Sequence, residues 1–482
     1  MADLYRLTAR EVVDLLRRRE VSPVELVDVA AQRIAATDGV LNALPTLCLD
    51  RARDHAKRFA EGKVRPSEGP GGLYGLPIAV KDLNDIAGVR TTYGSPLFAD
   101  HVPTRSDVLV ERLEAKGAIV LAKSNTPEFG AGATTFNEVF GATRNPWDVR
   151  LTCGGSSGGS AAALAAGQVW LATGSDLGGS LRIPASFCSV VGLRPSPGRV
   201  AAAPRTLPFD DMSIKGPMGR TVGDVALMLD AMAGHDPRDP LSIPAPGSCF
   251  VEAVERPRPP RRVGFSPDLG IAPVDPEVAR ISEQAAHRFT ELGAEVDAAC
   301  PDFRDAAATF QTLRAAAFLA SLGPLVQRHR ASFKPEIIWN VDKGLAVSTE
   351  ELGAALRARG QLYERVAAFF QRCDVLATPA VVAPPFPVEQ RYLTEVAGVV
   401  FDNYVEWLVL SFAITLTSCP AISVPCGFTQ DGRPVGLQLV GPPRGEHALL
   451  SAAACFERLV DLAERVPLDP RPAAPAAVTT SP

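Results

Sequence analysis

The chain has 482 residues, of which 46% are hydrophobic and 21% charged, and its formal net charge is −5. This composition is typical of a compact globular protein, so it excludes a disordered or fibrous chain. The small negative charge gives no electrostatic reason to expect nucleic acid or an anionic membrane surface as a partner, and a small-molecule substrate fits better.

The first residues contain no apolar segment typical of a secretion signal, and no window reaches the ~18 apolar residues of a membrane span. The longest candidate, residues 404–416, includes Glu406 and is predicted to be a buried helix. We therefore expect a cytoplasmic protein without a membrane partner. The nine cysteines include no CxxC pair, so buried free thiols are expected in place of disulfides or a zinc site.

The first half of the chain begins with helices and then changes to short apolar runs. Capping-box spacings predict helices that start after Thr8 and after Ser22. Residues 76–80 and 118–122 are predicted strands, and residues 106–116 between them have helical spacing. Strand, helix and strand in this order indicate a βαβ-like unit.

The second half continues as alternating α/β structure. A proline-rich stretch at 236–260 predicts a long surface crossing. Further elements are predicted as strands at 263–265, 294–296, 375–379, 421–425 and 436–440, and as helices at 276–292, most of 303–370 and 447–462. The segment from Pro467 to the last residue is rich in proline, alanine, threonine and serine, and this tail is predicted to be disordered.

Two clusters of glycine and serine carry the chemistry. Residues 154–160 (GGSSGGS) contain G-x-S-x-G twice, centred on Ser156 and Ser157, a pattern typical of the nucleophile elbow of an α/β-hydrolase. A second cluster follows at 174–182, and successive glycines let backbone N–H groups converge as an oxyanion hole requires. Neither cluster is followed by the lysine of a phosphate-binding loop, so acyl transfer is favoured over phosphoryl transfer.

A serine nucleophile needs a base, and the six histidines lie in contexts typical of surface or capping residues. His447 alone could complete a Ser, Asp, His order. Lys81 and Lys123 each end an apolar strand, where open α/β sheets place their ligand sites, and burial lowers the pKa of a lysine. Spacing leaves both lysines open, with an ion pair to Asp82 or Glu128 as the structural alternative.

With these motifs the sequence resembles the amidase signature family. The resemblance is carried by CGGSSGGSAAALAAG (153–167) and GSDLGGSLRIPA (174–185), and it extends to GLPIAVKD (75–82), KSNTPEFG (123–130), FGATRNPWD (140–148) and PAISVPCGF (420–428). It implies a single large α/β domain over residues 1–466, with a central mixed β-sheet covered by helices on both faces. The tail 467–482 would follow this domain.

The resemblance also implies a mechanism. Ser180 would be the nucleophile, Ser156 a bridging serine with a cis peptide bond, and Lys81 the base, which decides against Lys123. The oxyanion-hole N–H groups would come from Leu177, Gly178, Gly179 and Ser180. No metal or cofactor is needed for this chemistry.

Further positions take their expected roles from the same resemblance. Gly130, Ala131 and Gly132 would line the acyl pocket, and their small size suggests room for a bulky or aromatic acyl group. Residues expected to hold the loops together are Ser157, Ser175, Asp176 and Arg182. The region 300–410, where the resemblance is weakest, would supply much of the pocket wall.

The predicted function is hydrolysis of the C–N bond of a carboxylic amide, with aryl amides, esters and carbamates as further candidate substrates. The expected partner is a small amide-like molecule, with a homodimer left open. The alternatives are a glutamine-dependent amidotransferase subunit that works in a complex, a catalytically silent binding protein, and a His-dependent α/β-hydrolase esterase that uses His447.

Overall fold

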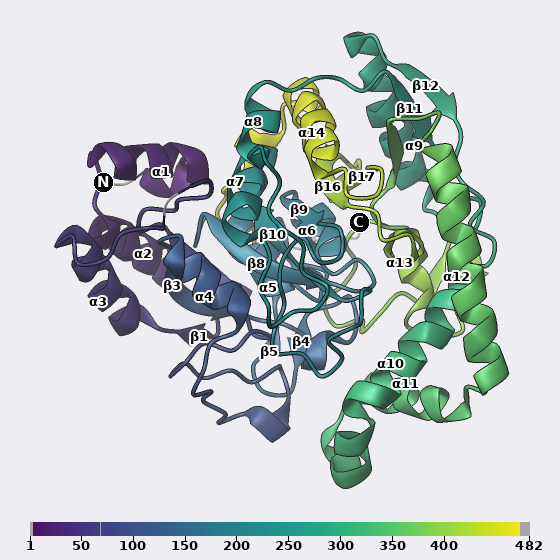
Figure 1. Cartoon of the computed structure of the whole chain (residues 1–482), viewed down its shortest axis with the longest axis horizontal. Coiled ribbons are helices and arrows are strands. Elements are labelled where there is room, and N and C mark those ends of the chain that lie inside the picture. Colours follow the sequence, from purple (N-terminus) through teal and green to yellow (C-terminus); the bar gives the residue numbers. More distant parts are fainter. Residues whose placement is uncertain (1–2, 68, 473–482) are drawn as a thin grey trace, which may run out of the picture.

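The computed structural model of the chain describes residues 3–67 and 69–472. Within these residues one central sheet holds eleven strands in the order β1-β3-β2-β8-β10-β9-β16-β17-β13-β11-β12 (Figure 1). The strands are β1 (Thr46–Leu47), β3 (Ile119–Ser124), β2 (Pro77–Lys81), β8 (Leu171–Asp176), β10 (Ile214–Gly219), β9 (Val191–Arg194), β16 (Ala421–Phe428), β17 (Pro434–Val440), β13 (Val375–Pro379), β11 (Arg262–Phe265) and β12 (Glu295–Ala298).

The sheet is mixed, as predicted. β3, β2 and β8 are parallel neighbours, and so are β13, β11 and β12 near the other edge. The strands between these two groups pair antiparallel. The βαβ-like unit is confirmed, because α4 (Val108–Ala115) connects β2 to its parallel neighbour β3.

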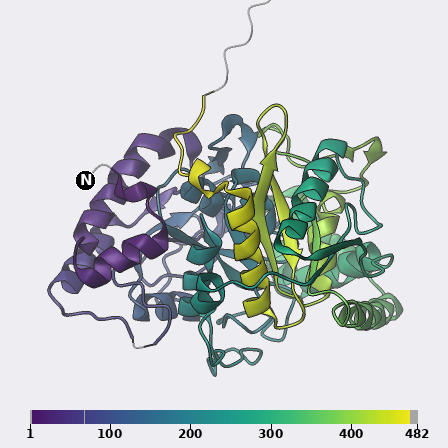
Figure 2. The same cartoon turned by 90° about the horizontal axis from the view of Figure 1, so that it is seen from above.

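Helices cover both faces of the sheet and extend beyond its ends (Figures 1 and 2). The N-terminal helices lie at one end of the molecule and α10 to α12 at the other. The remaining α-helices in the described residues are α1 (Ala9–Arg18), α2 (Pro23–Leu41), α3 (Leu49–Ala60), α5 (Gly158–Ala165), α6 (Arg182–Cys188), α7 (Val222–Met232), α8 (Phe250–Glu255), α9 (Pro276–His287), α10 (Ala306–His329), α11 (Pro335–Ala346), α12 (Thr349–Phe369), α13 (Val409–Leu416) and α14 (Glu446–Val460).

The predicted capping boxes are present at the start of α1 and α2. The side chain of Thr8 accepts a hydrogen bond from the Glu11 backbone N–H, and the Glu11 carboxylate accepts one from the Thr8 N–H. Ser22 and Glu25 repeat this arrangement. Each box satisfies two N–H groups that the first helical turn would otherwise leave unbonded.

Several elements differ from the sequence-based prediction. The strands β8, β9 and β10 were not predicted. Each contains glycine, and β10 also contains Pro217; both residue types are depleted in strands. The predicted crossing at 236–260 is interrupted by the helix α8. The six described residues of the predicted tail lie against the domain: the N–H of Leu468 donates to Ala165 and that of Arg471 to Pro146. The rest of that tail, 473–482, lies outside the described residues.

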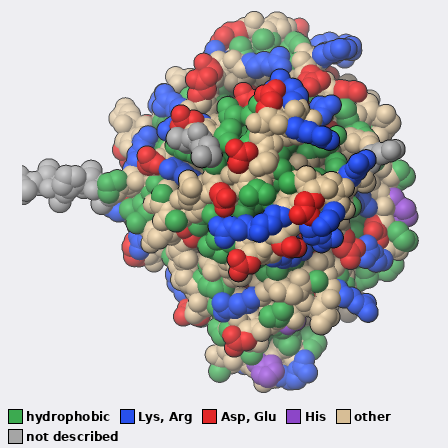
Figure 3. Space-filling view, turned by 90° about the vertical axis from the view of Figure 1, so that its left-hand side faces the viewer, with side chains coloured by type: hydrophobic (Ala, Val, Ile, Leu, Met, Phe, Trp, Pro, Cys, Tyr) green, Lys and Arg blue, Asp and Glu red, His purple; other side chains and the backbone are tan. Residues whose placement is uncertain are grey.

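The surface and the thiols agree with the composition. On the face shown in Figure 3, acidic and basic side chains are interspersed. No helix in the described part of the chain is both long and apolar enough to span a bilayer. All nine cysteines are free, five of them buried and four half-buried.

Candidate active site

The site lies where β2 and β8 end. These strands are parallel neighbours, so their carboxyl ends meet at the same edge of the sheet, where α/β proteins place ligand sites. Lys81 is the last residue of β2, and Ser175 is next to last in β8. The loop before α5 brings Ser156, and the loop before α6 brings Ser180.

Lys81 is fully buried and surrounded by serine hydroxyls. Its Nζ lies 2.6 Å from Oγ of Ser156, 2.8 Å from Oγ of Ser157 and 3.0 Å from Oγ of Ser175. Burial lowers the pKa of Lys81 well below its usual value, and the positive charge of Lys215 lowers it further, whereas Asp176 opposes the shift. The arrangement favours a neutral amine that can accept a proton from Ser156.

The peptide bond between Gly155 and Ser156 is cis. Backbone and side chains press closely on the glycines of this loop. A Cβ on Gly155 would lie 3.0 Å from the backbone of Thr134, and one on Gly158 would overlap the hydroxyl of Thr135. The glycine density of residues 154–159 therefore reflects close packing around the two loop serines.

Ser180 is 8% exposed and lies beside the Ser156 loop, since the Ser157 N–H donates to the carbonyl oxygen of Ser180 over 3.2 Å. Of the N–H groups predicted to form the oxyanion hole, that of Gly179 donates to Asp176 over 3.0 Å. Those of Leu177, Gly178 and Ser180 donate to no acceptor in the described residues. These three groups are free to bind a ligand oxygen.

Asp176 holds the second glycine cluster in place. It is fully buried and pairs with Arg182 over 2.8 Å and with Arg194 over 3.3 Å. Burial alone would raise the pKa of Asp176, but the charges and hydrogen bonds of Arg182 and Arg194 outweigh it and hold the pKa well below its usual value. Asp176 is therefore an ionised structural residue that fixes the loop carrying Ser180.

Lys123 has a different environment from Lys81. Its Nζ lies 3.1 Å from an Asp82 carboxylate oxygen and donates to Oγ1 of Thr91 and to the carbonyl oxygen of Asn84. This is the ion pair that the sequence left open for either lysine. Lys81 thus contacts the serines, and Lys123 contacts a carboxylate.

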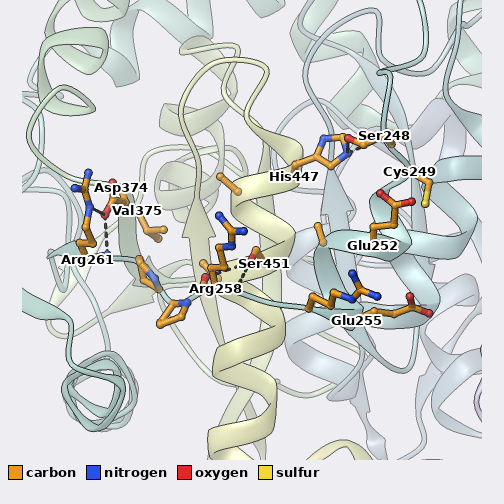
Figure 4. A pocket seen from close by; sticks show the side chains of 16 residues that line it. Ser248, Cys249, Glu252, Glu255, Arg258, Arg261, Asp374, Val375, His447 and Ser451 are labelled. Carbon is orange, nitrogen blue, oxygen red and sulfur yellow. Dashed lines mark hydrogen bonds and ion pairs between the residues drawn. The ribbon is translucent and has the colours of Figure 1, made fainter.

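His447 lies in another part of the molecule. Its Nε2 is 3.0 Å from the carbonyl oxygen of Ser248 and 3.1 Å from Oγ of the same serine (Figure 4). The His447 ring packs on Phe250. His447 lines a groove with a volume of about 1010 Å³. This groove shares no lining residue with the cavity that contains Ser156 and Ser180. The structure does not bring His447 to the serine clusters.

The cavity at the serines has a volume of about 300 Å³. Gly130 lines it, whereas Ala131 and Gly132 are not among its lining residues; Ala131 is buried with Phe318 and Val326. A Cβ on Gly130 would lie 3.3 Å from Oγ of Ser156, so this glycine keeps the backbone close to the serine loop.

Sequence reasoning missed part of the cavity wall. The missed residues come from β10 and from the loop before it, and they include Arg205, Asp210 and Lys215. Phe318 and Leu322 of α10 also line the cavity, and they lie in the region 300–410 that was expected to supply part of the wall. A lysine within a strand of low β-propensity was the only signal for Lys215. Within the described residues, no three His, Cys, Asp or Glu side chains are grouped as a metal site would require.

The fold and the site together define a mixed-sheet α/β protein in which serines gather around a buried lysine. The chain belongs to the amidase family, also called the amidase signature family, whose model matches residues 25–450. The match spans the sheet, both serine clusters and α10.

Relatives and solved structures agree with this assignment. The chain is 35% identical to an acylamidase of Rhodococcus erythropolis, over 97% of this chain and 98% of that protein. It is 36% identical to a glutamyl-tRNA(Gln) amidotransferase subunit of Moorella thermoacetica, over 96% and 99% of the two chains. Among solved structures, a bacterial aryl acylamidase of the amidase signature family has a TM-score of 0.87 at 28% identity, covering 96% of this chain and 98% of that one.

Proposed function

We propose that this chain hydrolyses the C–N bond of carboxylic amides, aryl amides among them, with Ser180 as the nucleophile, Ser156 as a proton relay and Lys81 as the base. The observation that carries the proposal is the fully buried lysine whose Nζ lies 2.6 Å from Oγ of Ser156. A buried amine among neutral hydroxyls can lose its proton near neutral pH, which an activated serine requires.

The proposed reaction has two halves. Neutral Lys81 takes a proton from Ser156, which takes one from Ser180 as the Ser180 oxygen bonds to the substrate carbonyl carbon. The negative charge on the carbonyl oxygen is stabilised by the free N–H groups of Leu177, Gly178 and Ser180. When the C–N bond breaks, the proton returns through Ser156 to the leaving amine. Water then attacks the acyl-enzyme by the same route and releases the acid.

The test uses acetanilide and two variants. Ser180→Ala and Lys81→Met should each lower aniline release by roughly 10³-fold or more, since members of a catalytic relay act as a unit. Lys57→Met, at an exposed position on α3, serves as the matched control and should retain activity. Mass spectrometry of quenched wild-type protein should find an acetyl group on Ser180. Full activity in Ser180→Ala would overturn the proposal.

Esters and carbamates share the tetrahedral chemistry of amides, and we include them in the proposed range. The values of kcat/KM for phenyl acetate, a phenyl carbamate and acetanilide, measured side by side, rank esters, carbamates and amides as substrates. Dependence of all three activities on Ser180 assigns them to one site.

We place this activity in the cytoplasm.

The second candidate is a component of a glutamine-dependent amidotransferase, which the relative in Moorella thermoacetica favours. The two candidates differ in what the purified chain does alone. Hydrolysis of acetanilide by a monomer or homodimer, with the molecular mass measured in the same sample by light scattering, supports the amidase. Activity only after a partner is added supports the amidotransferase.

A further inference from the structure

Lys215 faces the catalytic cavity from β10. It is half-buried and lines the same cavity as Ser156 and Ser180. In the antiparallel pairing of β10 with β8, Lys215 lies directly opposite Ser175, and residues in such pairs point to the same face of a sheet. Because Oγ of Ser175 contacts Lys81, this face is the catalytic one.

The charge of Lys215 is not neutralised by a close carboxylate. Within the described residues, no carboxylate oxygen lies within 4.0 Å of the Lys215 Nζ, the limit for an ion pair. The acids whose charges reach it most strongly, Asp107 and Asp85, accept hydrogen bonds from Asn84 and Tyr93 instead. Burial lowers the pKa of Lys215, and the charge of Asp107 opposes this shift. In the part of the chain that the structure describes, the Lys215 amine has no ion-pair partner.

The other charged residues on the cavity wall, Arg205 and Asp210, form an ion pair with each other. Arg205 lies 3.2 Å from Asp210 and also donates to the carbonyl oxygen of Ser213. Together the pair contributes little net charge. Lys215 consequently makes one side of the cavity electropositive, while Phe318 and Leu322 of α10 give another side an apolar surface.

We propose that Lys215 binds a carboxylate on the substrate, so that the preferred amides carry an anionic group together with an apolar one. This inference rests on the proposed amide hydrolysis at Ser180. An ammonium that has no ion-pair partner in the free protein gains a charge-assisted hydrogen bond when a carboxylate enters, and the half-buried position limits screening by water. Lys215 would thus determine specificity without taking part in bond breaking.

Two pairs of probes test on which side of the amide the carboxylate lies. Succinanilate and pentananilide release the same aniline and differ in a carboxylate on the acyl part. 4-Acetamidobenzoate and acetanilide differ in a carboxylate on the amine part. Wild-type protein should prefer the anionic member of at least one pair in kcat/KM. Lys215→Met should reduce that preference by roughly 10- to 100-fold, the range of a hydrogen bond to a charged group.

The controls separate charge from packing. Lys215→Arg keeps the charge and should retain the preference, and Lys57→Met should behave as wild type. Hydrolysis of the neutral probes should change much less than hydrolysis of the anionic ones in Lys215→Met. An unchanged ratio of anionic to neutral kcat/KM in Lys215→Met would overturn the inference while leaving the proposed function intact.

A binding measurement keeps the inference independent of turnover. Calorimetric titration of Ser180→Ala with the anionic probe should give a Kd that rises by a similar factor when Lys215→Met is added. If no probe is hydrolysed by wild-type protein, the proposed function fails, and this titration alone decides the role of Lys215. Equal Kd values with and without Lys215 would refute the anion site.

Discussion

At the scale of single residues, the protonation of Lys81 controls the proposed chemistry. Its three hydrogen-bond partners are neutral hydroxyls, which stabilise an ammonium far less than a carboxylate would. The charged groups that influence it, Lys215 and Asp176, act in opposite directions on its pKa. Burial, which lowers the pKa of Lys81 most, and these two opposing charges together set the pH below which Lys81 is protonated and cannot act as the base.

Removal of the Lys215 charge should therefore shift the pH dependence of the reaction. Protonated Lys81 cannot accept a proton, so kcat/KM falls as pH drops through the pKa of Lys81. Lys215→Met removes a repulsion that lowers this pKa, so the pKa rises and the acid limb of the acetanilide profile should move to higher pH. The neutral probe excludes effects on substrate binding. An acid limb that stays in place or moves to lower pH would contradict this electrostatic account.

Gly179 provides a second prediction at this scale. Its φ of +111° is unfavourable for other residues, and a Cβ at this position would overlap the side chain of Ser411. Gly179→Ala should lower stability by roughly 1–3 kcal/mol and reduce kcat by displacing the loop before Ser180. Thermal unfolding and kcat for acetanilide measure the two effects.

A double variant separates the two causes. Ser411→Gly removes the overlapping side chain, so Gly179→Ala should cost less stability in the Ser411→Gly background than in wild type. The cost that remains comes from φ and from the contact with Ile183. An equal cost of Gly179→Ala in the two backgrounds would mean that the overlap with Ser411 contributes nothing.

At the scale of elements, the junction of β8 and α6 depends on a buried charge cluster. Asp176 ends β8, Arg182 begins α6, and the two side chains are fully buried with each other. The cluster also reaches β9 through Arg194 and β17 through Gln438. It therefore joins the loop that carries Ser180 to the central strands of the sheet.

Arg182→Met should destabilise the protein strongly, because it leaves Asp176 buried with one cation fewer. We expect a loss of about 3–5 kcal/mol in the free energy of unfolding, measured by urea denaturation. The matched control is Arg150→Met, which breaks the exposed pair with Asp148 and should cause little measurable change. Equal losses in the two variants would show that burial of the pair is unimportant.

The elements also show what the sequence could reveal. Apolar runs such as 76–80 and 118–122 were recognisable as strands because their side chains are buried on both faces. β8 and β10 were not, because Gly174 and Gly216 are required where Leu181 and Leu193 approach the backbone too closely for a Cβ. The strand propensity of a short segment does not reflect contacts with residues distant in sequence, so these strands were missed.

The same limit applied to the site. The serine loops and two strand-ending lysines were recognisable from local signals, but these signals left Lys81 and Lys123 open. Only the resemblance to the amidase signature family chose Lys81. Lys215 was hidden in an unrecognised strand, and its significance depends on which carboxylates lie within reach, a property of the folded chain alone.

At the scale of the whole molecule, stability should depend on the ionisation of Glu457. This residue of α14 accepts a hydrogen bond from the N–H of Val222 at the start of α7. Burial, assisted by the charge of Asp224, raises its pKa from 4.5 to about 8 despite that hydrogen bond. The unfolded chain thus releases this proton near pH 4.5, whereas the folded chain keeps it until about pH 8.

The consequence is a loss of stability as pH rises through this interval, because the folded state binds the additional proton. Glu457→Gln keeps an acceptor for Val222 and cannot ionise. The free energy of unfolding of this variant, relative to that of wild type, should therefore rise by roughly 3 kcal/mol between about pH 5 and about pH 8. Urea denaturation at both pH values measures the gain, with Glu283→Gln at an exposed position of α9 as control. A difference that is independent of pH would refute the assignment.

The residues of the proposed relay and those of the cavity wall come from separate stretches of chain, which has a consequence for evolution. Lys81, Ser156 and Ser180 all precede α6, whereas Phe318 and Leu322 reach the cavity from α10, much further along the sequence. Mutations in α10 can alter which molecules fit without moving the reacting atoms. Proteins that descend from one ancestor can therefore diverge in the substrates they accept while they keep the same three residues, Lys81, Ser156 and Ser180.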